Sequence, residues 1–233
     1  MKPIIIANWK ANKTLEEIKT WVEKTKPVLS KQNNAEIIIC PSFTSIGLLN
    51  SLFKGTTVKT GGQSISHFEQ GAYTGEVTAS MLQGVVEYCI AGHSERKRFF
   101  NETEDDVLKK IENLLAFKIK PIFCIAGLNQ LDNYLVKNKK LLQENKKDII
   151  FVYEPPEAIS VAGKYRAQSP EEADVEAGKF AEKVDSDVVI YGGSVNPDNI
   201  AAFLSTKHIK GALIGNASLN PDTFLKLVEN IKK

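Results

Sequence analysis

Ionisable residues that could transfer protons stand directly after short apolar runs in this sequence. Glu154 closes one such run and precedes two prolines, which restrict the backbone after it. Asn8 and Lys10 follow another run, and His93 and Glu95 follow a third. Glutamate and histidine are common general bases and acids, and a lysine cation can stabilise a developing negative charge. If the apolar runs are parallel strands, this pattern predicts proton-transfer chemistry where their carboxyl ends meet.

A second group of residues is rich in glycine and is typical of an anion site. Gly192, Gly193 and Ser194 follow one apolar run, and Gly215 and Asn216 follow the last. Glycines let backbone N–H groups approach an anion, and a helix N-terminus adds its dipole. We therefore expect these loops to bind a phosphate group of the substrate. Taken singly, each of these residues could belong to an ordinary turn, and it is their common position after strands that favours a site.

Eight apolar runs alternate with helical patterns along the chain. The runs span residues 4–7, 36–40, 57–61, 86–91, 120–125, 149–153, 187–191 and 210–214. Helical segments are expected to begin near residues 14, 46, 78, 103, 128, 169 and 220. Strands that are apolar on both faces indicate a parallel sheet covered by helices, and eight such units close into a (β/α)8 barrel. The sequence predicts a single barrel domain over residues 1–233, with an open doubly wound sheet as the alternative.

Composition and charge exclude several classes of function. The formal net charge is +2, hydrophobic residues make up 42%, and no long block of one sign favours a nucleic acid or a membrane as partner. No apolar segment is long enough for export, so a cytoplasmic location is expected. The three cysteines lie in apolar runs, which indicates reduced, buried thiols. Metal-ligand spacings and a dinucleotide-binding glycine motif are lacking, so no metal and no cofactor are expected.

Six motifs resemble, in order and spacing, those of the triosephosphate isomerase family. They are Asn8-Trp9-Lys10, GAYTGE at 71–76, AGHSER at 91–96, VYEP at 152–155, YGGSV at 191–195 and IGNASL at 214–219. The resemblance spans the whole chain. It implies a TIM barrel that interconverts dihydroxyacetone phosphate and D-glyceraldehyde 3-phosphate through an enediol, without a cofactor, in glycolysis and gluconeogenesis.

The resemblance also implies a role for each ionisable residue. Glu154 would remove the C1 proton of dihydroxyacetone phosphate and return it at C2. Neutral His93 would donate a hydrogen bond to the carbonyl oxygen, and Lys10 would lie beside the developing oxyanion. Asn8 would help to hold the substrate, and Glu95 would orient the site by hydrogen bonding and ion pairing.

Residues 155–164 would form a lid that keeps water from the enediol. The Ser160 N–H is expected to bind phosphate, together with Gly193, Ser194, Gly215 and Asn216. The lid departs from the usual family pattern over residues 156–163, so its alignment stays open. Asn216 replaces a glycine of the family, and Ala126-Gly127 replaces a Gly-Glu pair.

The resemblance further implies a homodimer, in which residues 63–74 reach the active site of the other subunit. This loop keeps the family's length, although Ser64 replaces an asparagine. Two other functions stay open on the sequence alone. One is a different phosphosugar barrel, such as phosphoribosylanthranilate isomerase or indole-glycerol-phosphate synthase, which shares the phosphate loops but lacks the proton-transfer residues. The other is a catalytically silent barrel that binds a phosphorylated metabolite or a protein, and a surface binding role beside catalysis is also open.

Overall fold

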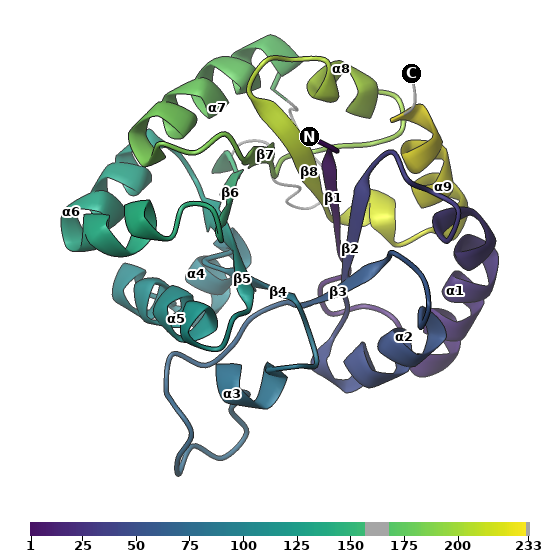
Figure 1. Ribbon diagram of the computed structural model, residues 1–233, viewed down its shortest axis with the longest axis horizontal. Helices are drawn as coiled ribbons and strands as arrows, with labels where there is room; N and C mark the ends of the chain where they lie inside the picture. The colour runs from purple at the N-terminus through teal and green to yellow at the C-terminus, as the bar shows by residue number, and fades with distance from the viewer. Residues whose placement is uncertain (157–167, 232–233) are drawn as a thin grey trace.

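A computed structural model of the chain describes residues 1–156 and 168–231, and it contains a closed parallel barrel (Figure 1). Each strand pairs with the next in the chain, and β8 returns to pair with β1. The strands are β1 (Ile4–Asn8), β2 (Glu36–Cys40), β3 (Lys59–Gly62), β4 (Tyr88–Ala91), β5 (Lys120–Ile125), β6 (Ile150–Tyr153), β7 (Val189–Tyr191) and β8 (Ile209–Ile214). The predicted (β/α)8 barrel is confirmed, and the open sheet is excluded.

Helices surround this barrel on the outside, and the loop between β3 and α3 projects away from it (Figure 1). The described helices are α1 (Leu15–Leu29), α2 (Ile46–Leu52), α3 (Ala79–Leu82), α4 (Ser94–Phe100), α5 (Glu104–Ala116), α6 (Leu128–Glu144), α7 (Pro170–Val184), α8 (Ile200–Leu204) and α9 (Pro221–Asn230). Short 3-10 turns, η1 (Phe43–Ser45) and η3 (Asn216–Ser218), follow β2 and β8. None of these helices is long and apolar enough to cross a membrane.

Helix starts agree well with the capping residues in the sequence. The side chains of Thr14, Thr103 and Ser169 each accept a hydrogen bond from the N–H at the third helical position, and the backbone N–H of each donates to the side chain at that position, which completes a capping box. Helices α4 and α8, and an interruption in α6, were not predicted. Helix α4 has no buried residue, so no apolar period marks it in the sequence, and Asn138 interrupts α6 with non-helical dihedral angles.

The core has two layers because successive strand residues point to opposite faces of the barrel wall. Ile6 and Val152 belong to the cluster inside the barrel, whereas their neighbours Ile5 and Phe151 pack with the helices outside it. Burial on both faces explains why the strands read as continuous apolar runs. The cysteines are free and buried, as expected, and burial raises the pKa of the Cys89 thiol to about 12.

Candidate active site

The carboxyl ends of β1, β4 and β6 bring together the predicted proton-transfer residues. Asn8 ends β1, His93 and Glu95 follow β4, and Glu154 follows β6. Asn8, His93 and Glu154 are buried, with exposed fractions of 5%, 6% and 3%. The side chains of Lys10 and Glu95 are about one third exposed. The most buried groups are therefore the two that the sequence assigns to proton transfer and the amide beside them.

The Glu154 carboxylate is held by two neighbours on the loop after β4. Its Oε1 atom lies 3.0 Å from His93 Nε2, and its Oε2 atom accepts a hydrogen bond from the Ser94 N–H at 3.0 Å. Its own N–H donates to the Ile125 carbonyl at 2.8 Å, which fixes the start of the loop after β6. The Ser94 N–H and the neighbouring imidazole thereby fix where the carboxylate lies.

The hydrogen bonds of His93 define which of its ring nitrogens carries the proton. Nδ1 accepts a hydrogen bond from the Glu95 N–H at 3.2 Å, so Nδ1 is unprotonated. In this tautomer Nε2 carries the proton, and it lies 3.0 Å from Glu154 Oε1. His93 is also the N-cap of α4. The contact with the Glu95 N–H therefore leaves Nε2 as the ring nitrogen that faces Glu154.

Lys10 is fixed by both its backbone and its side chain. Its Nζ atom pairs with Glu95 Oε1 at 2.6 Å, and its N–H donates to Asn8 Oδ1 at 3.1 Å. Its carbonyl accepts from Gln63 Nε2 at 2.9 Å. The φ angle of Lys10 is 53°, a left-handed conformation that is strained for a lysine. Such strain at a functional position persists only where several contacts hold it, as these do.

The two glycine-rich loops lie against the proton-transfer residues. A Cβ atom built on Gly192 would come within 3.3 Å of the Glu154 Cβ atom, and one built on Gly215 would come within 3.3 Å of Lys10 Cε. Gly193 has no room for a side chain, since its Cβ would lie 2.2 Å from the Tyr191 hydroxyl oxygen. The loops after β7 and β8 therefore lie directly beside Glu154 and Lys10.

The other predicted anion-binding residues differ in their exposure and local structure, and one of them is not described. Ser194 is half-buried, and its carbonyl accepts from Asn199 Nδ2 at 3.0 Å. Asn216 is exposed and opens the 3-10 turn η3 rather than an α-helix. Ser160 and most of the predicted lid lie outside the described residues. Among residues 1–156 and 168–231, no group of three or more acidic, cysteine or histidine side chains is placed to hold a metal.

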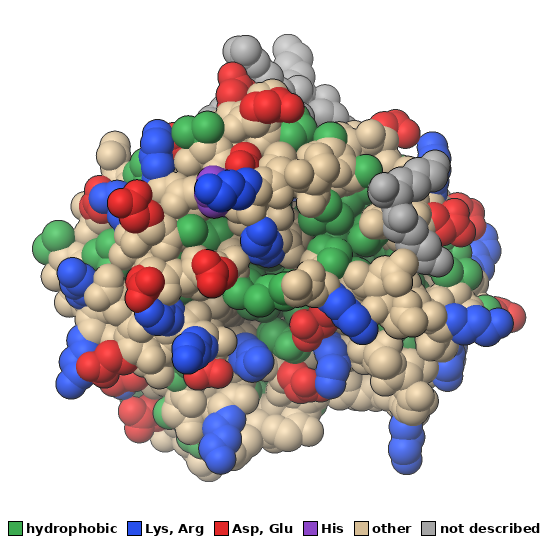
Figure 2. Space-filling view, turned by 45° about the horizontal axis from the view of Figure 1, so that its top comes forward, with side chains coloured by type: hydrophobic (Ala, Val, Ile, Leu, Met, Phe, Trp, Pro, Cys, Tyr) green, Lys and Arg blue, Asp and Glu red, His purple; other side chains and the backbone are tan. Residues whose placement is uncertain are grey.

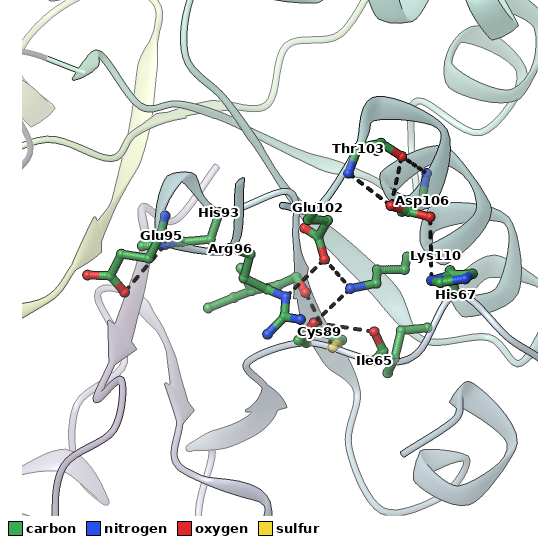
Figure 3. Close-up of polar contacts among 12 residues, drawn as sticks. Ile65, His67, Cys89, His93, Glu95, Arg96, Glu102, Thr103, Asp106 and Lys110 are labelled. Atoms are coloured by element: carbon green, nitrogen blue, oxygen red, sulfur yellow. Dashed lines mark hydrogen bonds and ion pairs between the residues drawn. The ribbon is translucent and has the colours of Figure 1, made fainter. Parts of the chain in front are cut away.

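Several supporting residues were not found from the sequence. Figure 3 shows Glu102 between Arg96 and Lys110, where its Oε1 atom accepts from Arg96 Nε at 2.9 Å and from Lys110 Nζ. Lys110 also donates to Ser64 Oγ at 3.2 Å, so this cluster joins α4, α5 and the loop after β3. Ser94 acts through its backbone N–H. A backbone donor has no residue-type signal, and a cluster drawn from three separate segments has no regular spacing in the sequence. Neither could therefore be found from the sequence.

Comparison with known proteins identifies the family. The family model described as triosephosphate isomerase matches residues 3–231. The chain belongs to this family. Three similar proteins bear the name triosephosphate isomerase: those of Dictyoglomus thermophilum (36% identical, covering 98% of this chain and 99% of the relative), Aquifex aeolicus (35%, 98% and 99%) and Solibacter usitatus (34%, 97% and 98%).

Family membership gives the reaction. The enzyme interconverts dihydroxyacetone phosphate and D-glyceraldehyde 3-phosphate, a step of glycolysis. This finding supports the predicted isomerase over the two alternative functions that the sequence left open.

The face drawn in Figure 2 carries basic and acidic side chains interspersed, with no block of one sign.

Proposed function

We propose that Glu154 is the base that moves the proton between C1 and C2 of the substrate. The observation that carries this proposal is the 3.0 Å approach of its Oε1 atom to His93 Nε2, between two buried side chains. The Nε2–H can serve the carboxylate or a substrate oxygen in turn. When substrate enters, the carboxylate leaves this contact for the C1 proton, and the Nε2–H becomes available to the carbonyl. The base and the electrophile are thus prepared for the substrate by the same contact.

The remaining ionisable groups stabilise the charge that develops on the substrate oxygens. Neutral His93 donates from Nε2, and Lys10 places its ammonium beside the oxyanion. Glu95 pairs with Lys10 and fixes the imidazole tautomer through its N–H. Asn8 supports the Lys10 backbone through its side-chain oxygen, and its amide nitrogen is free to hold substrate. Preorganised donors of this kind lower a barrier because they need no rearrangement during the reaction.

The substrate phosphate binds to backbone N–H groups of the loops after β7 and β8. Gly193 and Ser194 contribute from the first loop, and Gly215 and Asn216 from the second. The support is that both loops lie beside Glu154 and Lys10 and that Gly193 excludes any side chain. Ser160, outside the described residues, would add an N–H from the lid.

The His93 assignment is tested by 15N NMR at pH 7, with His93→Gln used to assign the signal among the three histidines of the chain. We expect Nδ1 to have the chemical shift of an unprotonated ring nitrogen and Nε2 that of a protonated one. An imidazolium, with both nitrogens protonated, would contradict the proposed role.

The enzyme is further proposed to be a homodimer that pairs through the loop after β3. On this loop Phe68 stacks on Tyr73, with ring centroids 4.0 Å apart and an angle of 6° between the planes. Both rings are exposed, by 38% and 43%. An aromatic pair held in this way is suited to a protein interface. Sedimentation at micromolar concentration should give twice the mass of one 25.8 kDa chain, and a mass near one chain would refute the dimer.

A further inference from the structure

Lys13 connects two loops of the active site although nothing in the motifs singles it out. Its Nζ atom donates a hydrogen bond to the Leu219 carbonyl at 2.6 Å, across 206 positions of sequence. The same ammonium lies 5.2 Å from the centre of the Trp9 ring, within the range of a cation–π contact. The side chain therefore spans from the loop after β1 to the loop after β8.

The backbone at Lys13 is held in an unfavourable conformation. Its φ angle is 73°, in the left-handed region that side chains rarely adopt. Asn12 Nδ2 donates to the Trp9 carbonyl at 2.8 Å and closes the loop before it.

Further contacts fix the segment that Lys13 holds. Trp21 Nε1 donates to the Ser218 carbonyl at 3.2 Å, so two successive carbonyls of this segment receive hydrogen bonds from the β1–α1 region. Ser218 Oγ donates to the Gly215 carbonyl at 2.6 Å. The segment from Gly215 to Leu219 is thereby fastened at its beginning and at its end.

We propose that Lys13 is a positioning residue that holds the loop after β8 in place to bind the substrate phosphate. The inference rests on the proposed phosphate role of Gly215 and Asn216. Lys13 does not touch substrate. It sets where the N–H groups of that loop lie relative to Lys10, which approaches Gly215 directly. Burial lowers the pKa of the Lys13 ammonium, against the opposing effect of the Glu17 carboxylate, and this shows how far the ammonium is withdrawn from water.

Two substitutions remove the ammonium with opposite effects on the backbone. Lys13→Met keeps an apolar stem and the strained φ angle, whereas Lys13→Asn eases the backbone because asparagine tolerates this conformation. A defect shared by both variants reports the lost ammonium and not the backbone. Lys118→Met is the matched control, since Lys118 also has a positive φ angle, 58°, but is exposed between α5 and β5 at the other end of the barrel.

Inorganic phosphate is the probe, and its dissociation constant is measured by intrinsic fluorescence. Both tryptophans of the chain, Trp9 and Trp21, contact this junction, so their emission should respond to phosphate. We expect the dissociation constant to rise about tenfold in both Lys13 variants and to stay unchanged in Lys118→Met. The ratio of kcat/KM for glyceraldehyde 3-phosphate to that for unphosphorylated D-glyceraldehyde should fall by a similar factor, because the smaller substrate does not use the phosphate site. Lys13→Arg should restore most of the phosphate affinity and most of the kcat/KM ratio.

Unchanged phosphate binding in a folded Lys13→Asn would overturn the inference. An equal loss with both substrates would also overturn it, because it would place the effect on the proton-transfer residues. Asn216→Asp tests the proposed phosphate site independently of the role of Lys13. If Asn216→Asp weakens phosphate binding and the Lys13 variants do not, only the role of Lys13 fails. If none of them does, the phosphate site itself is wrong.

Discussion

Removing the Lys10 ammonium tests whether a fixed positive charge stabilises the enediolate. Lys10→Met keeps the length of the side chain and its apolar stem, and the residue retains its backbone contacts to Asn8 and Gln63. The ion-pair partner Glu95 has a side chain 35% exposed, so water can solvate it once Lys10 is gone. The substitution therefore removes the charge with limited damage to the fold.

The size of the effect follows from Coulomb's law and the exposure of the ammonium. A unit charge about 4 Å from an oxyanion contributes roughly 4 kcal/mol at an effective dielectric constant near 20, and about 1 kcal/mol in bulk water. The Lys10 side chain is 30% exposed, which places it between these limits, and bound substrate excludes further water. Since about 1.4 kcal/mol corresponds to a tenfold change in rate, we expect kcat to fall roughly 10² to 10³-fold.

The assay is steady-state isomerisation of glyceraldehyde 3-phosphate, with Glu95→Gln as the comparison. That variant removes the other half of the ion pair but keeps the backbone hydrogen bond to His93. A partly exposed ion pair contributes at most about 1 kcal/mol, so Glu95→Gln should lower kcat by less than about tenfold. The double variant should resemble Lys10→Met. A Lys10→Met enzyme within tenfold of wild type would refute the charge-stabilisation argument.

Three further outcomes are expected. Glu154→Asp withdraws the carboxylate by about 1 Å and should lower kcat on the order of 10²-fold, measured as initial isomerisation rates; an unchanged rate would remove Glu154 as the base. Asn216→Asp places a negative charge at the phosphate site and should raise KM about tenfold by repulsion, whereas Asn216→Gly should leave it near wild type; equal KM values would exclude Asn216 from the site. Burial raises the pKa of the Asp174 carboxyl. Hydrogen bonds to this carboxyl, of which that from the His208 N–H has the largest effect, outweigh burial and hold the pKa below its ordinary value. The carboxylate thus stabilises the fold above about pH 4 and loses this effect as the pH falls through the lowered pKa. Asp174→Asn should lower Tm by about 2 to 4 °C at pH 7 and by less near pH 3, as calorimetry can check.

The barrel could be predicted because its strands are buried on both faces. Continuous apolar runs and the N-cap residues Thr14, Thr103 and Ser169 mark the elements before any coordinates are known. Boundaries were less accurate where pairing decides them. β3 starts at Lys59 and not at residue 57, because only residues 59–62 lie in register with β2 and β4. The exposed helix α4 and the interruption at Asn138 depend on tertiary contacts and loop geometry, which apolar periodicity does not record.

The proximity of Lys10, His93 and Glu154 could be predicted because each stands after a strand end and the barrel gathers those ends. The contacts that these residues make with their neighbours could not be predicted. The Ser94 N–H that binds Glu154 has no side-chain signature, and the lysine bridge from position 13 to position 219 crosses almost the whole chain. Contacts of this kind arise only once the barrel closes and brings β8 beside β1.

The central claim is that Glu154 moves the substrate proton in a site that protects the enediol. It is tested most directly by converting glyceraldehyde 3-phosphate with wild type and with Glu154→Gln, while methylglyoxal, the product of phosphate loss from the enediol, is followed in the same samples. The substitution keeps the size and shape of the side chain but removes its basic charge. We predict fast isomerisation with little methylglyoxal for wild type and a loss of isomerisation in the variant. Isomerisation by Glu154→Gln at the wild-type rate would contradict the account.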